Sequence, residues 1–299
     1  MSSYRSVLRD DLFADHLAIV TGGGSGIGRC ICHELAHLGA HVVLVGRTLE
    51  KLEAVAAEIA EDGGQASFKT CDIRDEERVK EVIGEVVDEQ GRIDLLVNNA
   101  GGQFAAPLVG ISKKGWEAVV STNLTGGFLM AREAFDQSMK ESGGAIVNIL
   151  ADMWRGMPGM GHSGAARAGM QNFTRTAAVE WAGVGVRVNA VAPGWIASSG
   201  MDTYPDYVKA TIPQLREHVL MKRLGTESEI SAAVCFLLSE AASFITGETL
   251  SVDGGAPLYP GNFPIPDHDA SQAYDGFHRS SIPEFLREHV GIDDDEPDA

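Results

Sequence analysis

The chain has 299 residues, of which 44% are hydrophobic and 22% charged, as is typical of a globular protein with one large α/β domain. Its 24 Lys and Arg residues and 42 Asp and Glu residues give a net charge of −18, which argues against nucleic acid and anionic membrane surfaces as partners. The four cysteines form no paired pattern, and no apolar run approaches the roughly 20 residues of a membrane span. We therefore expect a cytoplasmic protein.

A glycine-rich turn follows the first predicted strand. Residues 17–20 form an apolar run typical of a strand buried on both faces, and Thr21-Gly22-x-x-x-Gly26-x-Gly28 comes next, with Gly28 opening a helix. Because glycine has no Cβ, a phosphate can approach the backbone, and the helix N-terminus offers it unpaired N–H groups. The spacing is close to that of dinucleotide-binding turns. It predicts that this turn binds a cofactor through Gly22, Ser25, Gly26, Ile27 and Gly28.

Strand and helix patterns then alternate as far as residue 252. Further strands are predicted at 41–45, 66–70, 93–97, 145–150, 186–191 and 249–252, and helical patterns at 49–59, 79–87, about 112–139 and 162–181. A last helix should begin at the capping box Thr226-x-x-Glu229, after a variable segment at 193–224. This alternation predicts a doubly wound, parallel seven-stranded sheet with helices on both faces. Residues 13–256 would form this domain and residues 257–299 a partly irregular extension, whose acidic run at 293–296 should be solvated.

Six separately placed motifs make the chain resemble the short-chain dehydrogenase/reductase family over residues 13–256. They are Thr21–Gly28, Asp72, Asn98–Gly101, Asn123, Pro193-Gly194 and Asp253-Gly254-Gly255. The resemblance implies a Rossmann-type fold, a nicotinamide cofactor, a small-molecule substrate and a homo-oligomer, either a tetramer or a dimer.

The same resemblance implies further cofactor contacts. Asp72 and Ile73 would flank the adenine, and Ile196 and Ser198 would meet the nicotinamide end. The remaining residues expected along the nucleotide are Asn98, Ala100, Gly101, Pro193 and Gly194.

The end of the second strand bears on which nucleotide binds. An NAD site usually places a carboxylate about 20 residues beyond the glycines, where it accepts a hydrogen bond from the ribose 2′-OH. This strand ends Val45-Gly46-Arg47, and a guanidinium suits a 2′-phosphate, although Arg47 can also be an ordinary surface residue. The pattern favours NADP, with NAD as the alternative. The zinc-protease spacing of His33-Glu34-Leu35-Ala36-His37 is interpreted as a helix face, and no metal site is expected.

The predicted helix at 162–181 departs from the family pattern. Most members carry an upstream serine and then Tyr-x-x-x-Lys, whereas this chain has Ser163 and Arg167 at the latter two positions. The upstream serine position falls on Leu150 or Ala151, so that only Asn123 of the usual four residues remains. Ser163 and Arg167 are four residues apart and share one helix face. A serine hydroxyl is a far weaker acid than a phenol, and arginine stays protonated at neutral pH.

Hydrogen-bond donors without a proton-transferring acid suit a reaction in which charge develops on oxygen. The first interpretation is therefore reduction of the C=C bond of a trans-2-enoyl thioester. The chain also resembles the peroxisomal trans-2-enoyl-CoA reductases at 98–99, 101–104, 163–169, 235–238, 242–247 and 266–269. Candidate catalytic residues are Ser163, Arg167, Asn123 and Asp152, and Trp154, Met157, Met160 and Met201 are candidates for an acyl pocket or for core packing.

Two alternatives stay open. The chain resembles bacterial citronellol and citronellal dehydrogenases at 4–6 and 152–169, which implies an acyclic terpenoid alcohol or aldehyde as substrate. That chemistry needs another base, and Asp152, His162 and Tyr204 are candidates. The second alternative is a catalytically silent nucleotide-binding sensor or scaffold.

Overall fold

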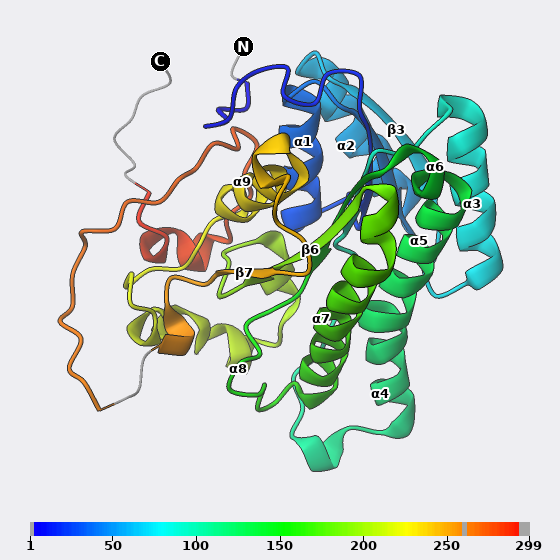
Figure 1. The fold of residues 1–299 in the computed structure, drawn as a ribbon. Coiled ribbons are helices and arrows are strands. Elements are labelled where there is room, and N and C mark those ends of the chain that lie inside the picture. The colour runs from blue at the N-terminus through cyan, green and yellow to red at the C-terminus, as the bar shows by residue number, and fades with distance from the viewer. Residues whose placement is uncertain (1–2, 259–261, 293–299) are drawn as a thin grey trace.

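The computed structural model describes residues 3–258 and 262–292, and its core is one sheet of seven parallel strands in the order β3-β2-β1-β4-β5-β6-β7 (Figure 1). The strands are β1 Leu17–Thr21, β2 His41–Gly46, β3 Gln65–Thr70, β4 Leu95–Asn98, β5 Gly144–Ile149, β6 Val186–Pro193 and β7 Thr249–Val252. This confirms the predicted Rossmann-type architecture. The helices are α1 Gly26–His37, α2 Leu49–Glu61, α3 Glu76–Gln90, α4 Lys113–Val120, α5 Gly127–Ala134, α6 Lys140–Ser142, α7 Gly161–Trp181, α8 Asp206–Lys209 and α9 Glu227–Leu238.

Strand β1 lies at the centre of the sheet, where the strand order reverses. Val20 pairs with Leu44 of β2 on one side and with Val97 of β4 on the other. The loops that follow β1 and β4 therefore leave the same edge in opposite directions and open a crevice between them. In sheets of this kind, ligands bind at this position.

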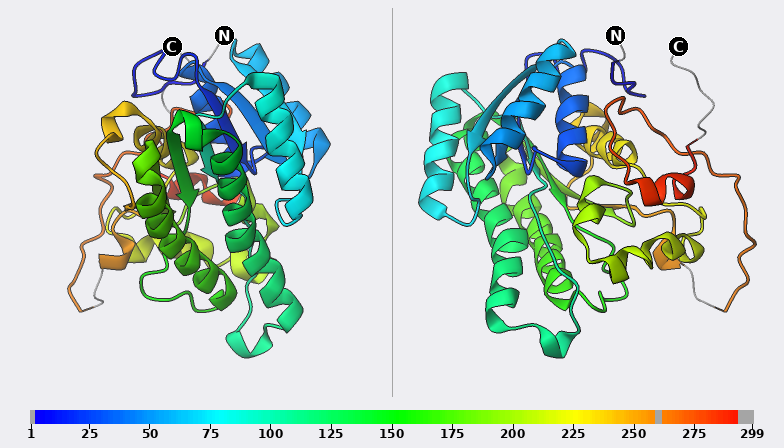
Figure 2. Two further views of the ribbon diagram at one scale, coloured as in Figure 1. Left: turned by 45° about the vertical axis from the view of Figure 1, so that its right-hand side comes forward. Right: turned by 180° about the vertical axis from the view of Figure 1, so that it is seen from behind.

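Side chains alternate between the two faces of β1, as expected for a strand buried on both sides. Ala18 and Val20 pack in one apolar cluster with residues of α1, α2 and α9, whereas Ile19 packs in another with residues of α3, α5 and α7. These two helical layers cover opposite faces of the sheet (Figures 1 and 2). The capping box of α9 is confirmed, because Thr226 Oγ1 accepts from Glu229 N and Glu229 Oε2 accepts from Thr226 N.

The region predicted as one long helical stretch at 112–139 is helical but interrupted twice. A π-helical turn at Ser121–Gly126 separates α4 from α5, and a second at Phe135–Met139 precedes α6. Such turns commonly occur at functional sites. The first of them contains Asn123. Helix α1 also differs slightly from its prediction, since it begins at Gly26 rather than Gly28.

The C-terminal segment, residues 262–292, has little regular structure but packs against the domain. Its 3₁₀ helix η9 (Glu284–His289) buries Leu286 against an apolar cluster that includes Met201 and Ile212. The proposed division at residue 257 stays a prediction, and the acidic run at 293–296 lies outside the described residues. No helix within the described ranges is long and apolar enough to cross a membrane.

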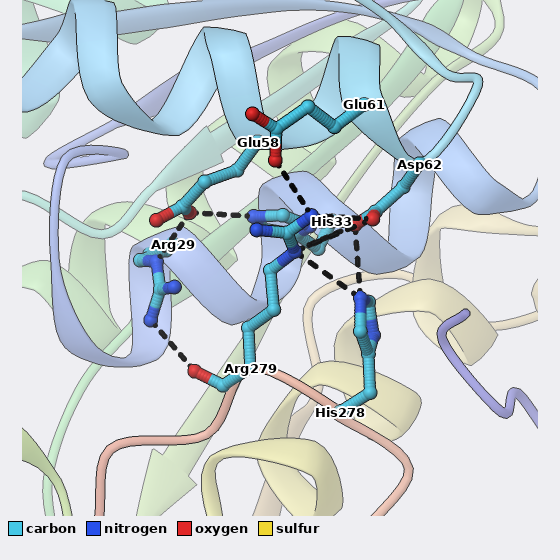
Figure 3. A network of polar contacts seen from close by, with 7 residues as sticks. All are labelled: Arg29, His33, Glu58, Glu61, Asp62, His278 and Arg279. Carbon is cyan, nitrogen blue, oxygen red and sulfur yellow. Dashed lines mark hydrogen bonds and ion pairs between the residues drawn. The ribbon is translucent and has the colours of Figure 1, made fainter. Parts of the chain in front are cut away.

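Polar contacts tie the C-terminal segment to α1 and α2 (Figure 3). Arg279 Nη2 donates to Asp62 Oδ1 at 2.8 Å and to Glu61 Oε2 at 3.0 Å, while Arg29 Nη1 donates to the Arg279 carbonyl at 2.9 Å. Phe277 is buried beside this network, with its ring 4.9 Å from that of His33. The segment therefore contacts the first turn of the helix that follows the glycine-rich turn.

Candidate active site

A cleft of about 740 Å³ opens at the carboxyl edge of the sheet, at the reversal of strand order. The loops after β1, β2, β4, β5 and β6 all contribute to its wall. Sixteen of the predicted site residues line it: Gly22, Ser25, Gly26, Ile27, Gly28, Arg47, Asp72, Ile73, Ala100, Gly101, Asp152, Arg167, Pro193, Gly194, Ile196 and Ser198. Five other candidates do not line it: Asn98, Asn123, Ser163, the alternative base His162 and Trp154.

The glycine-rich turn leaves the N-terminus of α1 open to the cleft. A Cβ on Gly28 would collide with the carbonyl oxygen of Gly22, so the turn packs too tightly against the helix for any side chain there. Gly26 has a φ of +57°, and a Cβ on it would meet only Glu227 Oε1 at 3.8 Å and Ser199 Oγ at 3.9 Å, both at ordinary contact distance. The Ser25 side chain makes no capping hydrogen bond. Free N–H groups and a backbone open to close approach fit a pyrophosphate.

Three cationic side chains line the cleft: Arg47, Lys51 and Arg74. Lys51 lies beside the glycine-rich turn, because a Cβ on Gly24 would be 3.1 Å from its Cβ. Arg74 Nε donates to Asp72 Oδ1 at 2.9 Å, and this hydrogen bond lowers the pKa of the Asp72 carboxyl, with the positive charge of Arg47 acting in the same direction. Asp72 is therefore ionised and held by Arg74. The sequence motifs did not single out Lys51 or Arg74, because each is a single charged residue near the start of a helix.

Asn98 departs from its predicted role along the nucleotide. Its side chain is buried and donates to the carbonyl of Gly127 and to Asn148 Oδ1, so that it joins β4 to α5 and β5 below the cleft. The following residue, Asn99, lines the cleft instead, and its side chain donates to the carbonyl of Thr21. Successive residues at a strand end face opposite sides, which accounts for the exchange of roles.

Asn123 holds the loop after β4 in place. Its Oδ1 accepts from Gly102 N at 2.9 Å and its Nδ2 donates to the Gly102 carbonyl at 2.8 Å. Both ends of the amide are therefore engaged by backbone, and the side chain does not line the cleft. This arrangement fits a positioning residue better than one that touches a substrate.

Arg167 brings an uncompensated positive charge to the cleft. Its Nη1 donates to the Ile149 carbonyl at 2.6 Å, and a Cβ on Gly101 would lie 2.5 Å from its Nη2. Its Nε is buried without a hydrogen-bond partner, and within the described ranges no charged side chain acts on its pKa. Burial lowers the pKa of Arg167 to about 10, so the guanidinium stays charged at neutral pH. It can donate to ribose hydroxyls or to an oxygen that develops negative charge.

Ser163 is fully buried and reaches the cleft only through a second residue. Its Oγ donates to Gln103 Oε1 at 2.7 Å, and Gln103 Nε2 donates to the Tyr204 hydroxyl at 3.0 Å. Gln103 and Tyr204 both line the cleft. Gln103 belongs to the stretch 101–104 that resembles the enoyl-CoA reductases, but sequence reasoning did not assign it to the site, because it lies in an irregular loop.

The two other candidate bases differ in access. Asp152 lines the cleft, and burial, with the nearby charge of Asp253 as a smaller contribution, raises the pKa of its carboxyl. His162 is fully buried and does not line the cleft. Its Nδ1 accepts from Ser163 N at 2.9 Å, and its ring meets Phe104 edge-on with the centroids 4.4 Å apart. His162 therefore supports the helix start, whereas Asp152 can meet a ligand.

The remaining wall of the cleft is largely apolar. Met157, Met160 and Met201 line it, as the pocket interpretation expected, but Trp154 does not. Further apolar lining comes from Leu150, Trp195, Val208, Ile212 and Leu215. Within the described part of the chain, no three His, Cys, Asp or Glu side chains gather as metal ligands.

The family model described as "Enoyl-(Acyl carrier protein) reductase" matches residues 22–257. The chain belongs to the short-chain dehydrogenase/reductase family. This dehydrogenase/reductase is 61% identical to the structure of a citronellol catabolism dehydrogenase from Pseudomonas aeruginosa PAO1, with a TM-score of 0.77 over 85% of this chain and 99% of that one.

Two other relatives differ in their described activities. A probable 2,4-dienoyl-CoA reductase of Bacillus subtilis is 39% identical over 248 residues, which is 81% of this chain and 96% of that protein. A structure from Beutenbergia cavernae, described as that of an NAD(P)-dependent gluconate 5-dehydrogenase with bound NADP at low occupancy, is 35% identical with a TM-score of 0.77. It covers 84% of this chain and all of the other. As a member of the short-chain dehydrogenase/reductase family, the chain described here is an NAD(P)-dependent oxidoreductase.

Proposed function

We propose that this enzyme is an NADP(H)-dependent dehydrogenase that interconverts an acyclic terpenoid alcohol of the citronellol type and its aldehyde. The observation that supports this substrate class most strongly is the 61% identity to a citronellol catabolism dehydrogenase over nearly the whole of that chain. A cleft lined by methionine and branched aliphatic side chains suits an unbranched or methyl-branched hydrocarbon, because apolar surface is removed from water on both sides.

The residues of the cleft fit NADP. The N-terminus of α1 would hold the pyrophosphate, the cationic group Arg47, Lys51 and Arg74 would hold a 2′-phosphate, and Arg167 would donate to the nicotinamide ribose. When bound, the cofactor supplies or accepts the hydride. The protein's part is to orient the substrate in the apolar half of the cleft and to move a proton to or from its oxygen.

A second candidate is reduction of the C=C bond of an enoyl thioester. The charged Arg167 guanidinium, with its Nε unpartnered, can stabilise an enolate oxygen, and the 2,4-dienoyl-CoA reductase relative matches 81% of this chain. We rank the alcohol–aldehyde activity first because the citronellol relative is 61% identical over 85% of this chain.

Absorbance of the reduced cofactor distinguishes these functions in the purified protein. We expect NADPH oxidation with citronellal and NADP reduction with citronellol, each faster than the same reaction with NADH or NAD. Turnover of a trans-2-enoyl-CoA without turnover of citronellal would support the second candidate. Tight NADPH binding with neither reaction would instead identify a nucleotide-binding sensor or scaffold.

A further inference from the structure

A phenol enters the cleft from an element other than α7. Tyr204 follows the 3₁₀ turn η5 (Ser199–Thr203) and is half-buried, with its side chain lining the cleft. Helix α7, by contrast, presents Ser163 at the position where the family pattern places tyrosine. The two residues are joined by Gln103, which hydrogen-bonds to both.

The directions of these hydrogen bonds determine what Tyr204 can do. Ser163 Oγ donates to Gln103 Oε1, which leaves the amide nitrogen of Gln103 to donate to the Tyr204 oxygen. Tyr204 therefore accepts from Gln103 and keeps its own O–H hydrogen for a group in the cleft. The same N–H donor stabilises the phenolate that forms when this hydrogen leaves.

The position of Tyr204 is fixed by packing as well as by the hydrogen bond. It lies against the apolar cluster that contains Met201 and Ile212, and Leu286 of the C-terminal segment is buried in the same cluster. Its backbone N–H donates to the Met201 carbonyl. A phenol held from two sides is suited to act on a reacting atom, since proton transfer depends on geometry first.

We propose that Tyr204 is the catalytic residue that transfers the proton to or from the substrate oxygen, and that Gln103 and Ser163 are its positioning residues. The proposal rests on the proposed alcohol–aldehyde activity. In aldehyde reduction, bound NADPH would supply the hydride and would be left oxidised as its own C–H bond breaks. The new C–H bond of the alcohol would form while the carbonyl π bond breaks. The Tyr204 O–H bond breaks as its proton passes to the substrate oxygen, and the phenolate then takes a proton from water. Alcohol oxidation follows the same steps in reverse.

The other titratable groups around the reaction site are less suited to this step. His162 is closed off from the cleft, with Nδ1 already accepting from Ser163 N. Arg167 keeps its proton at neutral pH. Asp152 lines the cleft and is therefore the one alternative of these three that could reach a ligand. For this reason the variant Asp152→Asn is tested beside Tyr204→Phe.

The test compares Tyr204→Phe with Tyr207→Phe, a matched control on α8 whose tyrosine is 70% exposed. We expect Tyr204→Phe to lower kcat for citronellal reduction by about 10²- to 10⁴-fold, the usual contribution of a general acid. Tyr207→Phe should leave kcat unchanged, and neither change should alter the Kd of NADPH measured by protein fluorescence. Asp152→Asn should lower kcat far less than Tyr204→Phe does.

Gln103→Leu distinguishes a positioning role from a structural one. Without the N–H donor the phenol is no longer held in place, so kcat for citronellal reduction should fall while the KM for citronellal and the NADPH Kd stay constant. An unchanged kcat, or equal changes in kcat and KM, would remove Gln103 and Ser163 from the proposal.

Three results would overturn the assignment of Tyr204. These are a Tyr204→Phe variant with the kcat of the wild type, one whose loss of activity is matched by a weaker NADPH Kd, and a larger loss in Asp152→Asn. Wild-type protein that does not reduce citronellal would overturn the proposed function and this assignment together. Wild-type activity that Tyr204→Phe retains would overturn only the assignment.

Discussion

Glu227 is a buried carboxyl group beside the glycine-rich turn, and its replacement by glutamine should remove a pH-dependent loss of stability. The residue is 5% exposed at the start of α9. Burial raises the pKa of Glu227 from its usual 4.5 to about 7, although the charge of Arg29 and a hydrogen bond from the Ser199 backbone act against this. Because the pKa of Glu227 is raised in the folded state, the stability that its neutral carboxyl contributes is fully present below the unfolded-state pKa. This contribution is lost as the pH rises through about 7.

The size of the effect follows from the two pKa values. Their difference corresponds to about 3 kcal/mol of unfolding free energy above neutral pH. The free energy of unfolding of Glu227→Gln minus that of the wild type should therefore be about 2 kcal/mol larger at about pH 8.5 than at about pH 5.5.

Urea unfolding at the two pH values measures this difference directly. Glu240→Gln is the control, because Glu240 is exposed, and its effect should be the same at both pH values. If the difference between Glu227→Gln and the wild type did not change with pH, the Glu227 carboxyl would not be held neutral by burial.

Three further predictions concern the cofactor and the C-terminal segment. Arg47→Asp should weaken NADPH binding by roughly 10- to 100-fold, the value of a charge-assisted hydrogen bond, and should leave NADH binding unchanged or improved. Equal losses in the two dissociation constants would contradict a 2′-phosphate contact. Gly26→Trp should abolish NADPH binding, because the side chain would fill the open backbone at a φ of +57°, and calorimetry showing normal affinity would refute the phosphate assignment. Phe277→Ala should cost about 3 to 5 kcal/mol in urea unfolding, as for other buried phenylalanines. A loss within experimental error would show that the segment does not pack in solution.

The fold could be predicted because each strand and helix has a strong local pattern. The apolar run at 17–20 and the capping box Thr226-x-x-Glu229 specify elements without reference to distant residues, and both lie where expected. The glycine motif also brings its residues to the cleft, since a tight turn after a central strand allows few other positions.

The details of the site depended on contacts that no local pattern specifies. Gln103 and Tyr204 are 101 positions apart, and both lie in irregular segments. Asn98 and Asn99 are adjacent, and only the pleat of β4 decides which side chain faces the cleft. Short stretches do not specify the substrate either, because separate stretches of this chain resemble the enoyl-CoA reductases and the citronellol dehydrogenases. A dimer or tetramer stays a prediction, which light scattering would test.

The burial of Phe277 and Leu286 in the C-terminal segment has a consequence for biosynthesis. Phe277 stacks on Tyr4, near the other end of the chain, and Leu286 packs behind the cleft wall. A nascent chain that has been synthesised only as far as the end of β7 therefore still exposes the apolar surfaces that these two side chains later cover. Maturation should be post-translational, and a messenger RNA truncated before codon 277 should yield a product that depends on chaperones and is cleared by proteolysis.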